Sequence, residues 1–126
     1  DEITHFACAA TREPGAVKLY THADNLGGHR LGGQGAHVEV EGRPLPEIID
    51  QAGFDRVDAM KMDIEGAEKP ALVGLFEGLE RGRWPRLVIL ENARRGEDEA
   101  ARGTCLDAGY RLDYATTLNA VLRLER

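Results

Sequence analysis

Three charged side chains alternate with apolar ones in a short segment near the middle of the sequence. Lys61, Asp63 and Glu65 are separated by Met62 and Ile64. Successive side chains of a β-strand point to opposite faces, so the three charges are expected on one side of a strand. A cluster of carboxylates can deprotonate and orient a hydroxyl group, or hold a divalent cation such as Mg²⁺ through its oxygen atoms. The segment therefore indicates acid–base or metal chemistry.

The elements around this segment place it at the end of a strand. An apolar run over 57–64 is typical of a buried strand, and Glu68 stands where the next helix begins. A second apolar run, over 86–92, ends in Glu91 and Asn92. In α/β sheets, ligands bind beyond the carboxyl ends of the strands. We therefore expect Glu68, Glu91 and Asn92 to converge on the crevice that holds Asp63 and Glu65. Glu91 and Asn92 are candidate substrate-binding residues there.

An ordinary solvated surface is the competing interpretation of the charged segment, because runs of charge usually mark exposed faces. For an isolated Asp-x-Glu it would be favoured, with Lys61 paired to Asp63 or Glu65. Here the strand-end position, and the acidic residue that ends the next strand, favour a functional site. A divalent-metal hydrolase built on Asp63, Glu65 and Glu91 is a weaker alternative, since it requires metal binding without any cofactor.

Hydrophobic periodicity predicts an α/β fold in a single domain spanning 1–126. Helix patterns and strand patterns alternate from residue 44 onward, which favours a mostly parallel sheet covered on both faces. The last two strands flank a turn at 116–119 and predict a C-terminal antiparallel hairpin. The expected strands are 3–10, 16–21, 37–41, 57–64, 86–92, 110–114 and 120–124, and the expected helices are 44–52, 68–81 and 97–108.

A glycine-rich segment, 25–35, separates the second and third of these strands. It holds five glycines together with His29 and Arg30. It contains no GxGxxG between a strand and a helix, so it does not predict a phosphate-binding loop. A plain surface loop is the favoured interpretation, and a mobile loop beside a site is the alternative. His29 is kept as a candidate substrate-binding residue on that second interpretation.

The bulk composition is typical of a soluble globular domain, with 42% hydrophobic residues, 30% charged residues and a net charge of −6. Scattered basic residues without interleaved aromatics argue against nucleic-acid binding. No apolar run is long enough to span a membrane, and no leader pattern stands at the start. Cys8 and Cys105 have no metal-site or redox-motif spacing, so a reducing, cytoplasmic setting is expected.

The acidic segment and its surroundings resemble the signature of the FkbM-type methyltransferases. The similar residues are Val57 to Glu68 (VDAMKMDIEGAE), Leu72, Gly74, Leu87 to Glu91, Ala108-Gly109-Tyr110, Ala9-Ala10, Pro14-Gly15 and Leu45 to Ile49. The resemblance implies S-adenosylmethionine as methyl donor and a small molecule, a sugar or secondary metabolite, whose hydroxyl is methylated. It also implies that Asp63 and Glu65 are the catalytic or metal-binding residues, supported by Lys61 and Glu91.

The sequence departs from that family in one respect. The family fold opens with a strand that ends in a glycine-rich, cofactor-binding turn, and a second strand follows with an acidic residue for the ribose. Neither precedes Ile3. We therefore expect a partial Rossmann-like methyltransferase domain, truncated at its N-terminus, that does not bind S-adenosylmethionine tightly. The alternative is a non-catalytic half-domain that forms a homodimer, or binds a partner, through the exposed edge of strand 57–64.

Overall fold

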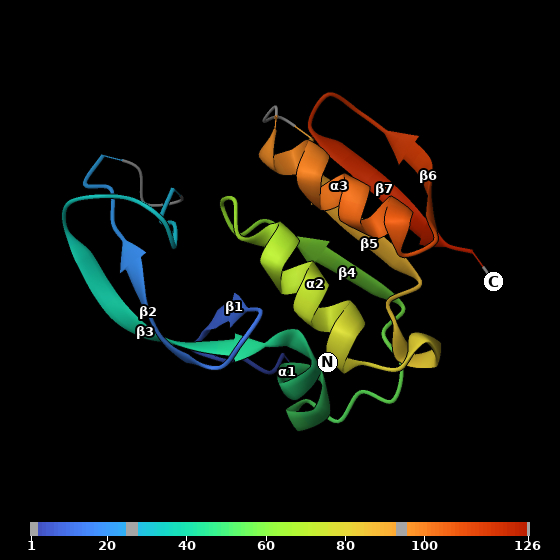
Figure 1. Cartoon of the computed structure of the whole chain (residues 1–126), viewed down its shortest axis with the longest axis horizontal. Coiled ribbons are helices and arrows are strands. Elements are labelled where there is room, and N and C mark those ends of the chain that lie inside the picture. The colour runs from blue at the N-terminus through green and yellow to red at the C-terminus, as the bar shows by residue number, and fades with distance from the viewer. Residues whose placement is uncertain (1–2, 25–27, 93–95, 126) are drawn as a thin grey trace.

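The computed structural model describes residues 3–24, 28–92 and 96–125, which form two β-sheets, three α-helices and a short 3₁₀ helix, η1 (Arg81–Arg83) (Figure 1). The strands are β1 (Ala9–Thr11), β2 (Gly15–Tyr20), β3 (His37–Pro44), β4 (Ala59–Met62), β5 (Leu87–Glu91), β6 (Tyr110–Ala115) and β7 (Asn119–Leu124). The helices are α1 (Leu45–Gln51), α2 (Glu68–Gly78) and α3 (Glu97–Asp107). The predicted α/β class and the order of elements after residue 44 are confirmed. Within the described ranges, no helix is long and apolar enough to cross a membrane.

The first sheet has the order β1-β3-β2, with β1 parallel and β2 antiparallel to β3. Its two long strands form a curved ribbon that reaches away from the helices, as Figure 1 shows. β1 is much shorter than the predicted strand 3–10, because only Ala9 to Thr11 have partners on β3. Ile3 is 96% exposed, so the prediction of a buried strand from residue 3 is wrong. An apolar run forms a strand only where another strand offers hydrogen-bonding groups.

The second sheet has the order β4-β5-β7-β6 and lies against α2 and α3 (Figure 1). β4 is parallel to β5, whereas β7 is antiparallel to both β5 and β6. Three of its four strands therefore point the same way, and the predicted C-terminal hairpin of β6 and β7 is confirmed. The prediction of one mostly parallel sheet is nevertheless corrected, since three of the five strand pairings among the described residues are antiparallel. The tight turn after β6 reverses the chain, so β7 runs antiparallel to β6 and lies between β6 and β5.

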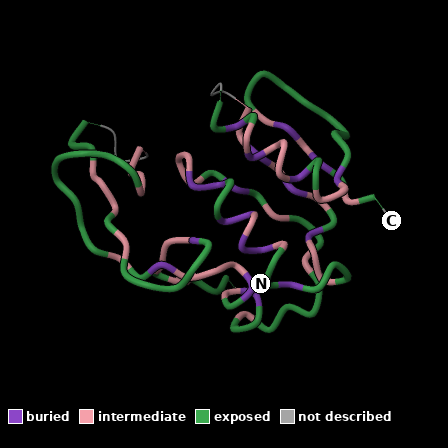
Figure 2. Tube along the Cα trace, in the orientation of Figure 1, coloured by how far each residue is buried: buried purple, intermediate pink, exposed green. Residues whose placement is uncertain are grey.

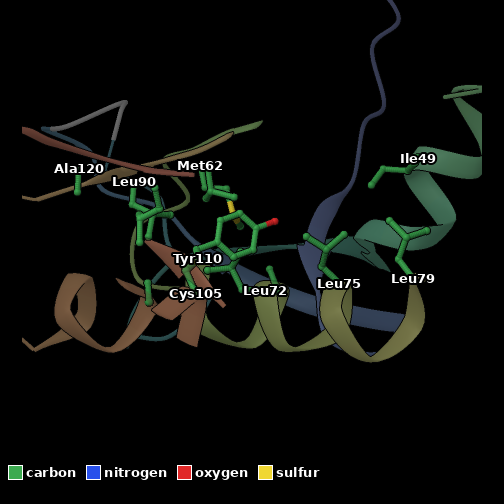
Figure 3. Packing of buried hydrophobic residues seen from close by; sticks show 13 residues of the cluster. Ile49, Met62, Leu72, Leu75, Leu79, Leu90, Cys105, Tyr110 and Ala120 are labelled. Atoms are coloured by element: carbon green, nitrogen blue, oxygen red, sulfur yellow. The ribbon is translucent and has the colours of Figure 1, made fainter. Parts of the chain in front are cut away.

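The hydrophobic core lies between this second sheet and the helices α2 and α3. Figure 2 shows the buried residues concentrated there and few in the first sheet. Leu72 and Leu75 of α2 pack with Val88 and Leu90 of β5 in one buried cluster (Figure 3). Phe76 lies against the rings of Trp84 and Tyr110, at centroid distances of 4.6 and 5.7 Å. The helical spacing predicted for α2 thus places its apolar side chains on the sheet.

The opposite face of the second sheet carries none of the described helices, which corrects the expectation of cover on both faces. Burial alternates along β5, where Val88 and Leu90 are buried and Ile89 is half-buried. Ile89 is paired with Lys61 on one side and Val121 on the other, so these three share the uncovered face. β4 has a strand neighbour on one side only among the described elements. The other edge strand, β6, likewise has only β7 beside it, so among the described elements this sheet has two open edges and one face without a helix.

Candidate functional site

The predicted charged strand ends earlier than its alternation suggested, and its last charged residue lies in a turn. β4 stops at Met62, and α2 begins at Glu68. Between them, Glu65 has φ 55° and Gly66 has φ 97°, both in the left-handed region. That conformation is uncommon for a residue with a side chain. The prediction that Lys61, Asp63 and Glu65 share one face of a strand is therefore wrong for Glu65. The turn after β4, and not a strand, sets the direction of its side chain.

Glu68 closes this turn from the helix side. The Ile64 N–H donates to Glu68 Oε1 at an N–O distance of 2.8 Å, and the Gly66 N–H donates to Glu68 Oε2 at 2.9 Å. The Glu68 residue is only 4% exposed. Its carboxylate therefore accepts hydrogen bonds from the backbone of the turn. The expectation that Glu68 joins the other acidic side chains in the crevice is corrected.

The turn brings three of the predicted carboxylates together at the carboxyl ends of β4 and β5. One ligand oxygen from each of Asp63, Glu65 and Glu91 lies within 4.8 Å of the other two. The parallel pairing of Met62 with Leu90 explains this, because both strands end at the same edge. The convergence expected from the sequence is therefore present for these three carboxylates.

Lys61 forms an ion pair with one member of this group. Its Nζ lies 3.5 Å from Asp63 Oδ2, and the two side chains are 58% and 47% exposed. The surface pairing considered for the sequence is therefore real, and it coexists with the carboxylate cluster. An exposed pair of this length contributes little to stability.

Asn92 is engaged by the protein itself. Its Nδ2 donates to Thr116 O at 3.0 Å, its Oδ1 accepts from Arg102 Nη1 at 3.1 Å, and its backbone N–H donates to Leu118 O at 2.7 Å. These contacts tie the end of β5 to the β6–β7 turn and to α3. The structure thus gives Asn92 a structural position and does not place it in the cavity described next.

A cavity of about 560 Å³ lies between the two sheets, beside the turn after β4. One wall is apolar and includes Phe6 to Ala10 with Leu19, Leu31 and Val40. The polar side chains that line it are His5, His29, Arg30, Asp63 and Glu65. Two predicted catalytic residues and the predicted substrate-binding histidine therefore share one cavity. Lys61, Glu91 and Asn92 are not among the described residues that line it.

Arg30 joins the glycine-rich segment to the rest of the site, a role that the sequence did not reveal. Its backbone pairs with Tyr20 in both directions, at 2.8 and 3.1 Å, and its Nη2 lies 2.8 Å from Glu97 Oε1 at the start of α3. A Cβ placed on Gly66 would meet Glu97 Oε2 at 2.8 Å and Arg30 Nη2 at 2.9 Å. The ion pair thus passes directly over the turn. Residues 25–27 of that segment lie outside the described ranges.

The Gly66→Ala variant is expected to lose about 1–3 kcal/mol of stability, because a residue with a side chain is strained at its positive φ. Urea unfolding followed by circular dichroism measures the change. Gly82→Ala is the matched control, since a Cβ there meets nothing within 4 Å and its φ is not positive. Equal stability of the two variants would contradict this account of the turn.

Comparison with known proteins identifies the family of the chain. Residues 2–112 match the model of the methyltransferase FkbM domain. The chain belongs to this family of methyltransferases, as the resemblance of its acidic segment indicated. Comparison with curated proteins and with solved structures gives no match.

Proposed function

We propose that this chain forms the acceptor side of an S-adenosylmethionine-dependent O-methyltransferase with a partial Rossmann-like fold. The observation that carries the proposal is the cluster of Asp63, Glu65 and Glu91 at the carboxyl ends of two parallel strands, with the first two lining a cavity. The acceptor is a hydroxyl group of a small molecule, such as a sugar or a secondary metabolite. The family membership of the chain supports the reaction class.

Asp63 is proposed as the base that takes the acceptor proton, with Glu65 beside it. A hydroxyl oxygen becomes a better nucleophile as its proton passes to a carboxylate within hydrogen-bond reach. Lys61, whose Nζ lies 3.5 Å from Asp63 Oδ2, is proposed to hold the Asp63 carboxylate in place through this ion pair. His29 lines the same cavity and is proposed to bind the acceptor.

The described residues do not fit a cradle for S-adenosylmethionine, which when bound would supply an electrophilic methyl group. The glycines of 28–35 lie between two strands, β2 and β3, rather than between a strand and a helix. The open edge of β4 and the uncovered face of its sheet support the proposal that further strands complete the domain. We call this chain joined to those strands the complete domain.

A divalent cation such as Mg²⁺ is a separate prediction for Asp63, Glu65 and Glu91. Oxygen ligands of Mg²⁺ lie about 2.0–2.1 Å from the ion, hence at most about 4.2 Å apart. The 4.8 Å grouping needs only small side-chain rotations to reach that spacing. The nearby ammonium of Lys61 opposes a cation there, so acid–base chemistry is the better supported role. Calorimetric titration with Mg²⁺ that gives no heat would exclude the ion.

The test of the proposed reaction is transfer of a labelled methyl group from S-adenosylmethionine to a panel of hydroxyl compounds by the complete domain. A methyl ether product, identified by mass spectrometry, is the expected result. Methylation at nitrogen or carbon alone, or no transfer to any panel member, would overturn the proposal.

The alternative is a non-catalytic half-domain that forms a homodimer along the open edge of β4. Its support is the single strand neighbour of β4 among the described elements, because an unpaired strand offers backbone groups to another chain. Sedimentation equilibrium of the chain decides between the two: a tight dimer supports the half-domain, and a monomer argues against it.

A further inference from the structure

We infer that Glu68 is a positioning residue, whose carboxylate fixes the two peptide planes that aim Asp63 and Glu65. The inference rests on the proposed function for its catalytic consequence, but its structural part stands on the geometry of the turn. Glu68 does not line the cavity, and both of its side-chain oxygens accept backbone hydrogen bonds.

The identity of the two backbone donors makes this role specific. The Ile64 N–H belongs to the peptide unit that joins Asp63 to Ile64, and the Gly66 N–H belongs to the unit that joins Glu65 to Gly66. Each residue that carries a predicted catalytic carboxylate therefore has its following peptide plane held by Glu68. Both hydrogen bonds are charge-assisted, which makes them stronger than neutral ones.

The two hydrogen bonds to Glu68, which we call the clamp, are needed because the backbone conformation of the turn is unfavourable. Glu65 adopts φ 55° although it has a side chain, and such a conformation persists only when surrounding contacts enforce it. One of those contacts is the Ala67 N–H to Ile64 O hydrogen bond, which is long at 3.3 Å. The two bonds to Glu68 are shorter, at 2.8 and 2.9 Å, so they provide the stronger restraint.

The side chain at position 68 must present two acceptor oxygens at this reach. Glutamine would keep one acceptor and turn an NH₂ donor toward the other backbone N–H. Aspartate is one methylene shorter, and alanine removes both acceptors. The graded series Glu68→Gln and Glu68→Ala therefore weakens the clamp in two steps, and rescue by the isosteric glutamine is expected to be incomplete.

Hydrogen exchange of the chain, measured amide by amide with NMR, tests the clamp without any activity. The amides of Ile64 and Gly66 are expected to exchange about tenfold faster or more in Glu68→Gln, and faster still in Glu68→Ala, because local opening loses hydrogen bonds to a charged acceptor. The amides of Leu90 and Leu122, buried in the sheet, serve as the internal reference for global unfolding. Acceleration of all four amides together, or of none, would overturn the inference.

Glu77→Gln is the matched control, since Glu77 lies on the same helix and forms an exposed ion pair with Arg12 at 2.8 Å. It is expected to leave exchange at Ile64 and Gly66 unchanged. In the complete domain, Glu68→Gln is expected to lower kcat by about tenfold or more while KM for S-adenosylmethionine stays within about threefold. Normal kcat beside accelerated turn amides would overturn the positioning role, whereas a wild-type domain that transfers no methyl group would contradict only the proposed function.

Discussion

The Asp63→Asn variant of the complete domain is expected to lose methyl transfer by a factor of about 10²–10⁴ in kcat, the range typical of removing a general base. Asparagine keeps the size of the side chain and its place beside the cavity, but it cannot accept the acceptor proton. Because Asp63 is proposed to act on the acceptor, the dissociation constant for S-adenosylmethionine is expected to stay within about threefold of wild type. Stopped assays with a labelled methyl donor and equilibrium dialysis measure the two quantities.

Asp58→Asn is the control for this substitution. Asp58 lies directly before the first residue of β4, away from the cavity, and forms an exposed ion pair with Arg56 at 3.0 Å. The Asp58→Asn substitution therefore removes the same charge as Asp63→Asn at a position outside the cavity. It is expected to keep kcat near wild type. If Asp63→Asn weakens cofactor binding as much as turnover, Asp63 is not an acceptor-side base.

The Leu72→Ala variant is expected to destabilise the chain by about 2–5 kcal/mol, the usual loss for a buried leucine. Leu72 is fully buried, and Figure 3 shows it beside Cys105 and Tyr110 in the layer between α2 and the sheet. A loss of that size is a large fraction of the total stability of a small domain. Urea unfolding followed by circular dichroism gives the change in the midpoint.

Leu106→Ala, on α3, is the control, since Leu106 is 44% exposed. Its expected effect is below about 1 kcal/mol, because little apolar surface is returned to water and alanine favours a helix. A loss at position 72 no larger than at position 106 would mean that α2 does not pack as described.

Local pattern predicted the second half of the fold well. The strand at Leu87–Glu91, the helix at Glu97–Asp107 and the hairpin after Tyr110 agree with the predicted ranges to within one or two residues. These elements depend on periodicity and on turn residues close in sequence. The helix predicted over 68–81 ends earlier, at Gly78, because Leu79 adopts an extended backbone before η1.

Long-range pairing could not be predicted in the same way. The shortness of β1 and the division into two sheets depend on which strands meet, and the periodicity of one segment does not contain that information. Cys105 lies within the predicted helix 97–108 and is completely buried in the structure. This burial raises the pKa of its thiol to about 12.

In the candidate site, too, features of local sequence were predicted and long-range contacts were not. Asp63, Glu65 and Glu91 were found because the carboxyl ends of parallel strands meet at one edge. The ion pair of Arg30 with Glu97 could not be predicted, because it joins residues 67 positions apart. Asn92 was assigned to the substrate since it follows a strand, whereas the structure uses it to hold the β6–β7 turn. Strand ends identify where a site lies, but not which polar groups the protein uses for itself.

We propose that this chain supplies the acceptor side of the site and does not bind S-adenosylmethionine tightly on its own. Calorimetric titration of the chain with S-adenosylmethionine, beside the same titration of the complete domain, tests it most directly. We predict micromolar binding by the complete domain and no micromolar binding by the chain. Micromolar binding by the chain would contradict the claim, because the described residues would then form a cofactor site on their own.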